Sequence, residues 1–140
     1  MTAKKLFLVR GIPGSAKSTI ASQLSNGGSM YHYEADNFFY DDHGNYNYDP
    51  AQIKAAHQWC QKMTDLSLKN GSVVVANTFT TLKELRPYFE IAKKHGIVPN
   101  VVLAQNNFKN THNVPEATLV AMKQRFVYDI SPLFEEFYPE

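Results

Sequence analysis

The feature that most constrains this chain is a glycine-containing turn between a strand pattern and a helix pattern. The turn comprises Gly11, Ile12, Pro13, Gly14, Ser15, Ala16, Lys17, Ser18 and Thr19. Residues 6–9 before it are continuously apolar, and residues 19–24 after it carry Ile20 and Leu24 on one helical face. Strand, glycine turn and helix are the context of a phosphate-binding loop, whose inward N–H groups and helix N-terminus bind an anion. We therefore expect residues 11–19 to bind the phosphates of ATP.

The individual residues of this loop suggest individual roles. Lys17 is expected to reach the β- and γ-phosphates and the Ser18 hydroxyl to ligate Mg²⁺. Ala16 departs from the pattern G-x-x-x-x-G-K-[ST], because it stands where the second glycine is expected. If this position needs a positive φ, alanine costs on the order of 1 kcal/mol. The alternative interpretation is an ordinary turn before a helix with an exposed lysine.

Composition limits the remaining possibilities. A length of 140 residues predicts a single domain, 1–140. The formal net charge of +1 provides no overall basic field, so a nucleic-acid partner would need a local patch. The single cysteine, Cys60, excludes an intrachain disulfide and a multi-cysteine zinc site. We expect no signal peptide, no membrane partner and a cytoplasmic location.

Strand and helix patterns alternate along the chain. The apolar patterns predict strands over 6–9, 30–34, 73–76 and 97–104, and helices over 19–24, 49–69, 81–95, 115–128 and from 131 onward. Thr81 and Glu84 have the spacing of a capping box, and Pro87 is expected to kink or restart the third helix.

This alternation predicts an α/β fold. We expect a parallel sheet of four or five strands with helices on both faces. Ligands of such sheets bind beyond the carboxyl ends of the strands. The phosphate loop, residues 34–48, residues 77–80 and residues 105–113 should therefore surround one crevice.

Two acidic residues follow the second predicted strand. Transfer of a phosphoryl group needs a residue that accepts the proton of the attacking hydroxyl. Glu34 and Asp36 are both candidates, and Asp36 is preferred because it lies beyond the end of the strand. The alternative is that Asp36 is a solvated cap.

Four basic residues lie on the last loop and its helix. Lys109, His112, Lys123 and Arg125 could belong to a lid that brings cations over the phosphates. Taken singly, each is also compatible with ordinary surface charge.

Several sequence blocks together resemble a known family. The blocks are Arg10-Gly11-Ile12-Pro13-Gly14-Ser15, Glu34-Ala35-Asp36-Asn37-Phe38-Phe39, Gly44-x-Tyr46, Ala56-His57-x-Trp59-Cys60, Val73 to Thr78 and Lys109 to Pro115. In this order they resemble the P-loop kinases related to the kinase domain of bacteriophage polynucleotide kinase. The resemblance implies the α/β P-loop kinase fold with a short lid. The resemblance implies that Lys17 and Ser18 bind ATP and Mg²⁺, that Asp36 activates the acceptor hydroxyl, and that the catalytic lid cation is near Lys109 or Arg125.

The chain departs from this family at three positions. Ala16 replaces glycine, Ala76 stands where the family usually has an aspartate, and Lys109 stands where arginine is usual. The aspartate would hold the metal, so its absence leaves Ser18, Asp36 and solvent as the expected Mg²⁺ shell. Lysine keeps the charge of arginine but lacks its bidentate fork.

The function that these observations favour is an ATP-dependent phosphotransferase. The expected acceptor is the 5′-hydroxyl of a polynucleotide, a single-stranded nucleic acid, or a nucleotide-like molecule. Seven of the seventeen Phe and Tyr residues fall between positions 31 and 48, where they could stack on a base or simply anchor a long loop. The alternatives are a small-molecule kinase of the same fold and a nucleotide-binding module with little turnover.

Overall fold

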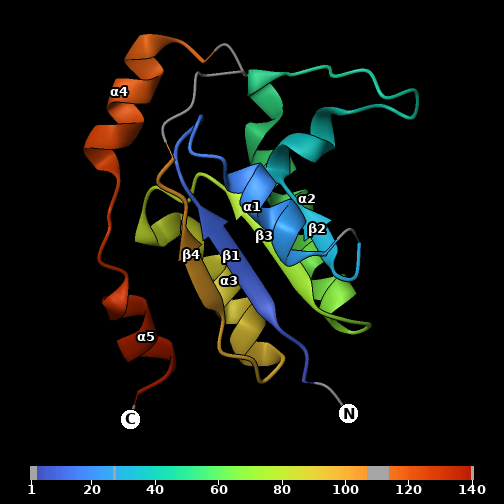
Figure 1. Ribbon diagram of the computed structural model, residues 1–140, viewed down its shortest axis with the longest axis vertical. Coiled ribbons are helices and arrows are strands. Elements are labelled where there is room, and N and C mark those ends of the chain that lie inside the picture. The colour runs from blue at the N-terminus through green and yellow to red at the C-terminus, as the bar shows by residue number, and fades with distance from the viewer. Residues whose placement is uncertain (1–2, 27, 107–113, 140) are drawn as a thin grey trace.

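Four parallel strands form the central sheet of the protein. The computed structural model describes residues 3–26, 28–106 and 114–139. The strands are β1 (Leu6–Arg10), β2 (Tyr31–Tyr33), β3 (Val73–Asn77) and β4 (Asn100–Leu103), in the order β2-β3-β1-β4. Every pairing is parallel, so all carboxyl ends lie at one edge, at the top of Figure 1. The predicted parallel α/β sheet is confirmed, with four strands in the described part of the chain.

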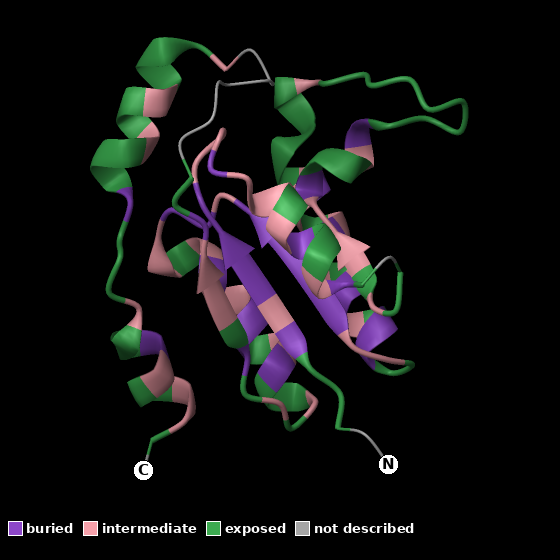
Figure 2. Ribbon diagram, in the orientation of Figure 1, coloured by how far each residue is buried: buried purple, intermediate pink, exposed green. Residues whose placement is uncertain are grey.

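Helices cover both faces of this sheet. The α-helices are α1 (Lys17–Leu24), α2 (Ile53–Leu68), α3 (Leu82–Lys94), α4 (Glu116–Arg125) and α5 (Ser131–Phe137), and the 3₁₀ turns are η1 (Ala35–Phe39) and η2 (Pro50–Gln52). Figure 1 shows α1 on one side of the sheet and α2 and α3 on the other. The sheet is therefore a middle layer, and Figure 2 shows β1 and β3 as its most buried strands.

The alternation of side chains along β1 and β3 produces two cores. Leu8 and Val75 pack in the core that α2, α3 and α5 cover, whereas Val9 and Ala76 pack in a smaller core against Ala21 of α1. All five residues are nearly inaccessible to solvent. Strands buried on both faces need continuously apolar sequences, which explains the runs at 6–9 and 73–76.

Most predicted elements are present, with shifted ends. The fourth strand begins at Asn100 rather than 97, since Gly96 leaves α3 with φ +70° and Pro99 has no N–H to donate. The last long helix stops at Arg125 rather than 128, where Phe126 takes an extended conformation and its ring enters the interior. The predicted capping box of Thr81 and Glu84 is confirmed. Pro87 does not restart the third helix, because α3 runs through it without interruption.

The packing of α5 on α3 yields a stability prediction. Phe89 of α3 is fully buried, and its ring lies 5.0 Å from Phe134 and 6.0 Å from Phe137 of α5. Phe89→Ala should therefore lower the free energy of unfolding by about 3–5 kcal/mol, because the cavity cannot collapse completely. Chemical denaturation followed by circular dichroism measures this loss.

A matched apolar truncation on the surface provides the control. Val98 is 56% exposed, so Val98→Ala should change the free energy of unfolding by less than about 0.5 kcal/mol. A loss below about 1 kcal/mol for Phe89→Ala would contradict the packing of these two helices.

Candidate functional site

The phosphate loop joins β1 to α1 at the carboxyl edge of the sheet. Gly14 has φ +89° and Ala16 has φ +70° with ψ +25°, so both residues are left-handed. Gly11 is required for a different reason: a Cβ there would lie 2.3 Å from Ser15 Oγ and 2.9 Å from the Ala104 carbonyl oxygen. The φ of Ala16 is positive, which is the condition under which the sequence analysis assigned alanine a cost on the order of 1 kcal/mol at this position.

The loop has the features of an anion-binding site. Ala16 is the N-cap of α1 and makes no side-chain cap hydrogen bond, so its side chain satisfies none of the first N–H groups of the helix. Ser15 Oγ is buried and has no hydrogen-bond partner in the part of the chain that the structure describes. Burial lowers the pKa of the half-buried Lys17 ammonium, while the charges of Glu34 and Asp36 act in the opposite direction. Phosphate oxygens would satisfy all these donors at once.

Two carboxylates approach the loop from the end of β2, and they have different partners. Ser18 Oγ donates a hydrogen bond to Glu34 Oε1 over 2.8 Å, and His32 Nε2 lies 2.8 Å from Glu34 Oε2. The Tyr46 hydroxyl donates to Asp36 Oδ1 over 3.1 Å. Because η1 begins at Ala35, the backbone is not extended between the two acids, and their side chains bond to separate groups.

Asn77, at the end of β3, fixes the start of η1. Its Oδ1 accepts the N–H of Ala35 over 2.9 Å, and its Nδ2 lies 3.7 Å from Cys60 Sγ in α2. Asn77 and Cys60 are both buried. Ala35 immediately precedes Asp36, so this contact sets where the chain leaves the sheet to present that carboxylate.

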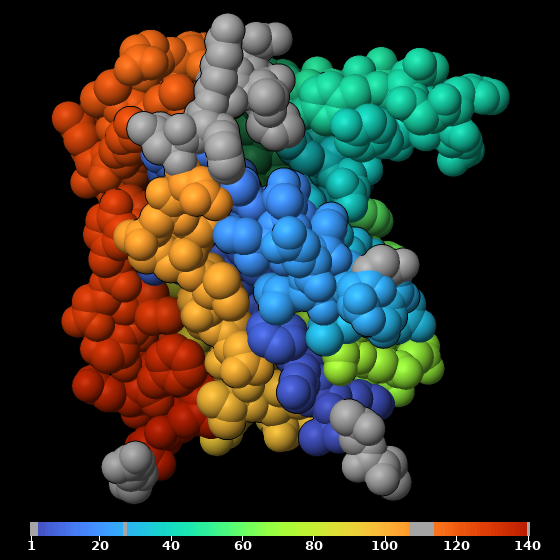
Figure 3. Space-filling model, viewed as in Figure 1, coloured from blue at the N-terminus to red at the C-terminus, as the bar shows by residue number. Residues whose placement is uncertain are grey.

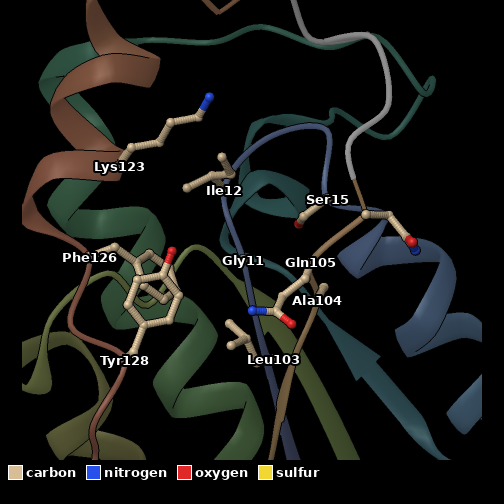
Figure 4. A pocket seen from close by; sticks show the side chains of 10 residues that line it. Gly11, Ile12, Ser15, Leu103, Ala104, Gln105, Lys123, Phe126 and Tyr128 are labelled. Atoms are coloured by element: carbon tan, nitrogen blue, oxygen red, sulfur yellow. The ribbon is translucent and has the colours of Figure 1, made fainter.

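A pocket of about 270 Å³ lies on the β4 side of the loop (Figure 4). Gly11, Ile12 and Ser15 form one wall, residues 103–106 form another, and Lys123, Phe126 and Tyr128 form the third. The rings of Phe126 and Tyr128 lie 4.8 Å apart. The pocket therefore combines an aromatic wall, a cation and polar groups beside the phosphate loop.

The predicted lid cations have different positions. Lys123 lines the pocket, and its ammonium extends over the region of Ile12 in Figure 4. Arg125 is directed elsewhere, because its Nε donates to Thr80 Oγ1 over 3.1 Å. Lys109 and His112 lie outside the described residues. Of the four predicted lid cations, Lys123 is therefore the one that lies beside the phosphate loop in the part of the chain that the structure describes.

Arg10 is a site-forming residue whose role the sequence did not indicate. Its guanidinium is almost fully buried and donates to the Phe79 carbonyl oxygen from Nε at 3.1 Å and from Nη2 at 2.7 Å. The ring of Phe126 lies 4.3 Å from the guanidinium carbon. Burial lowers the pKa of Arg10, against the opposing charges of Glu84 and Tyr128. The sequence signal that could have indicated this role is the position of a charged residue at the end of a continuously apolar strand.

Comparison with known proteins decides the family. The family model described as an AAA domain matches residues 6–128. The chain belongs to this family. The match, together with the fold, confirms the recognition of a P-loop kinase-like chain.

Individual relatives of this AAA-domain chain differ in length. Human NEDD4-binding protein 2 is 32% identical over 93 residues, which cover 64% of this chain but only 5% of that protein. An uncharacterized protein of Pasteurella multocida strain Pm70 is 27% identical over 132 residues, covering 84% of this chain and 73% of that protein. The Pnkp1/Rnl/Hen1 RNA repair complex contains a chain of similar fold, with TM-score 0.59, 17% identity, and coverage of 99% of this chain and 44% of that one.

The residues of the AAA-domain site fit Mg²⁺ bound with a nucleotide. Ser18 keeps free lone pairs while it donates to Glu34, and hydroxyl and carboxylate oxygens are the ligands that Mg²⁺ prefers. No group of three or more His, Cys, Asp or Glu side chains gathers around one point among the described residues. Phosphate and water would therefore supply much of the shell of a bound Mg²⁺ ion, which is usual for this ion. Within the described ranges no helix is both long and apolar enough to cross a membrane.

The left-handed Ala16 yields a prediction about the loop. Ala16→Gly removes a strain of about 1 kcal/mol but adds backbone entropy to the unfolded chain. We expect the free energy of unfolding to stay constant or rise by up to about 1 kcal/mol, with ATP affinity retained within about threefold. Thermal unfolding and calorimetric titration measure the two quantities.

The control is the same alanine-to-glycine substitution at a residue whose φ is helical. Ala21 is buried in the interior of α1, so Ala21→Gly should cost at least about 1 kcal/mol. An equal cost for Ala16→Gly would argue against strain at Ala16.

Proposed function

We propose that this protein transfers the γ-phosphoryl group of ATP, with Mg²⁺, to a hydroxyl of a polynucleotide or nucleotide-like acceptor. The observation that carries the proposal is the meeting of a phosphate loop with two carboxylates at one edge of the sheet. Lys17 lies within the electrostatic reach of both Glu34 and Asp36. A loop that binds a nucleotide with Mg²⁺ uses one acid near the metal, whereas a phosphotransferase also needs a group that accepts the proton of the attacking hydroxyl, and a second carboxylate can do this.

ATP would occupy the loop and the pocket beside it. The phosphates would receive the loop N–H groups and Lys17, and the base would enter the pocket against Phe126 and Tyr128. Lys123 would add a charge over the phosphates from the opposite wall. Bound Mg²⁺ would neutralise charge on the phosphates. These assignments make Lys17, Ser18 and Lys123 the contacts that orient the donor.

Asp36 would act as the general base. Tyr46 is its hydrogen-bond partner in the described part of the chain, and it holds one carboxylate oxygen. The residue is exposed, so an acceptor can reach the other oxygen. The acceptor hydroxyl oxygen would form a bond to the γ-phosphorus while the bond to the β–γ bridging oxygen breaks. Its proton would pass to Asp36, and ADP would leave.

The aromatic hairpin next to Asp36 supports a nucleotide-like acceptor. Residues 40–48, the tyrosine arm, project from the body beside η1 (Figure 3). Tyr40, Tyr46 and Tyr48 are each about half exposed, and the rings of Tyr46 and Tyr48 are nearly parallel, 11° apart. Tyr46 connects this surface to Asp36. Exposed aromatic faces bind nucleobases by stacking.

The charge of this region favours recognition of the base over recognition of phosphate. Residues 36–52 contain four carboxylates, Asp36, Asp41, Asp42 and Asp49, and no lysine or arginine. A polyanionic backbone would be repelled from such a segment, whereas an uncharged ring would not. The fold similarity to a chain of an RNA repair complex is consistent with a nucleic-acid acceptor.

The role of Asp36 gives the first test. Asp36→Asn keeps the shape but cannot accept a proton, so kcat on a 5′-hydroxyl oligonucleotide should fall about 10²- to 10⁴-fold. Calorimetric affinity for ATP should stay within about threefold, whereas Lys17→Ala should abolish it. Asp42→Asn, a carboxylate at the tip of the arm, is the matched control with unchanged turnover.

Two other outcomes would revise the assignment. Wild-type turnover in Asp36→Asn would reject Asp36 as the base. A parallel loss of ATP affinity that high Mg²⁺ restores would make Asp36 a metal ligand instead. Activity on sugars but on no nucleoside or oligonucleotide would favour a small-molecule kinase.

The tyrosine arm gives a second test, in which the acceptor itself is changed. Loss of a stacked base costs about 10- to 100-fold in affinity, so an oligonucleotide with an abasic 5′-terminal residue should have a KM higher by that factor. Tyr48→Ala should raise the KM of the normal acceptor similarly and leave the KM of the abasic acceptor unchanged. Tyr48→Phe retains the ring and should behave like the wild type.

Tyr31 provides the control for this experiment. It is 43% exposed but lies at the amino end of β2, opposite Val73, the first residue of β3. Tyr31→Ala should therefore leave both KM values unchanged. If wild-type protein phosphorylates the abasic and normal acceptors equally well, the arm is not a base-binding surface.

A further inference from the structure

The partner of the Ser18 hydroxyl comes from an unexpected strand. Ser18 Oγ donates to Glu34 Oε1 at 2.8 Å, and Glu34 directly follows β2. In phosphate-loop enzymes generally, the loop hydroxyl and an aspartate from a neighbouring strand hold Mg²⁺ together. The strand next to β1 on this side is β3, and its position 76 is an alanine that is 1% exposed. β3 therefore offers no carboxylate at that point.

The sheet register explains how Glu34 reaches the same place. Tyr33 of β2 is opposite Val75 of β3, so the next residues in register are Glu34 and Ala76. Tyr33 and Val75 both pack in the core under α2, which directs the following pair to the α1 face. Ala76 does pack with Ala21 of α1. Neighbouring strands are about 4.8 Å apart, and the extra methylene of glutamate helps to bridge that distance.

We propose that Glu34 is the carboxylate that holds and orients the Ser18 hydroxyl as a ligand of Mg²⁺ in this protein, acting from β2 where β3 carries Ala76. It would accept the Ser18 hydrogen bond and so direct a lone pair of that hydroxyl toward the ion. This inference deepens the proposed function, on which it rests for the presence of a nucleotide with Mg²⁺. The two acids then have separate roles. Glu34 helps to bind the metal, and Asp36, which is hydrogen-bonded to Tyr46, accepts the proton of the acceptor hydroxyl.

The surroundings of Glu34 suit a permanent negative charge. Its second oxygen, Oε2, is 2.8 Å from His32 Nε2, and only about a fifth of each side chain is exposed, 20% and 24% respectively. Burial alone would raise the pKa of Glu34. Hydrogen bonds from His32 and Ser18, with the charges of His32 and Lys17, outweigh burial and lower that pKa. The carboxylate is thus ionised at neutral pH and fixed in orientation before any ion arrives.

Nucleotide binding, without turnover, gives the direct test. ADP affinity is measured by calorimetry with and without Mg²⁺, and the ratio of the two gives the Mg²⁺ enhancement. Groups that orient metal ligands contribute about 10- to 100-fold to metal affinity, so Glu34→Gln should reduce the enhancement by at least tenfold. Affinity for ADP without Mg²⁺ should not fall, since a negative charge near the phosphates has been removed. Glu90→Gln, an exposed acid on α3, should behave like the wild type.

A rescue experiment tests the spatial equivalence of positions 34 and 76. Glu34→Ala should lose the Mg²⁺ enhancement, and Glu34→Ala with Ala76→Asp should regain most of it. Thermal unfolding shows whether the double variant is folded. If Ala76→Asp prevents folding, Glu34→Gln still decides the question, because it replaces a partly exposed side chain by one of the same shape.

Two results would overturn the inference. One is an unchanged Mg²⁺ enhancement in Glu34→Gln, and the other is a folded double variant no better than Glu34→Ala. The measurement needs no acceptor, so failure of the proposed phosphotransfer and failure of the Glu34 assignment are distinguishable. A protein that transfers no phosphate but loses its Mg²⁺ enhancement in Glu34→Gln would retain this metal shell.

Discussion

The parallel pairing of β1 with β3 on one side and β4 on the other is the constraint on which the site depends. Leu6 to Arg10 pair in register with Val73 to Asn77, and Phe7 to Arg10 pair with Asn100 to Leu103. Parallel pairing brings the carboxyl ends of separate strands to one edge, where the chain must leave the sheet in loops. The phosphate loop, η1 and the segment after β4 all begin there, although they are far apart in the sequence.

Arg10 extends this constraint to the pocket. Its buried guanidinium binds the Phe79 carbonyl oxygen, at a residue with φ +46°, and contacts the ring of Phe126. A buried guanidinium is costly to desolvate, so its donors need fixed partners. The N–H of Val127 also donates to the Thr80 carbonyl oxygen over 2.7 Å. The end of α4 is thereby attached to the loop after β3, which holds Lys123 beside the phosphate loop.

The two acids near Lys17 illustrate how local backbone decides chemical role. Glu34 is the last residue before the chain turns, and it bonds to Ser18 and His32 in a partly buried setting. Asp36, two residues later in η1, is exposed and bonds to Tyr46. Burial, then the charge of Asp36, raise the pKa of Tyr46 to about 12, so its phenol remains a proton donor at neutral pH. Similar side chains thus meet different surroundings within three positions.

The sequence by itself determined the fold class and the phosphate loop. Continuous apolar runs at 6–9 and 73–76 are typical of strands buried on both faces, and Thr81 with Glu84 specify a helix start locally. Motif spacing also singled out Ala16 as the position that departs from the glycine pattern, and the structure shows that its φ is positive. All these features depend on neighbours in the chain, which is why pattern and spacing predicted them.

Tertiary structure decided which side chains meet. The contact of Ser18 with Glu34 requires the register of β2 against β3, which is not encoded by either strand alone. Arg125 donates to Thr80, and the next residue, Phe126, packs its ring against the Arg10 guanidinium. Lys123, two residues before Arg125, lines the pocket. Helical and strand periods fix the face of each residue, but only the packing of one element on another fixes what that face touches.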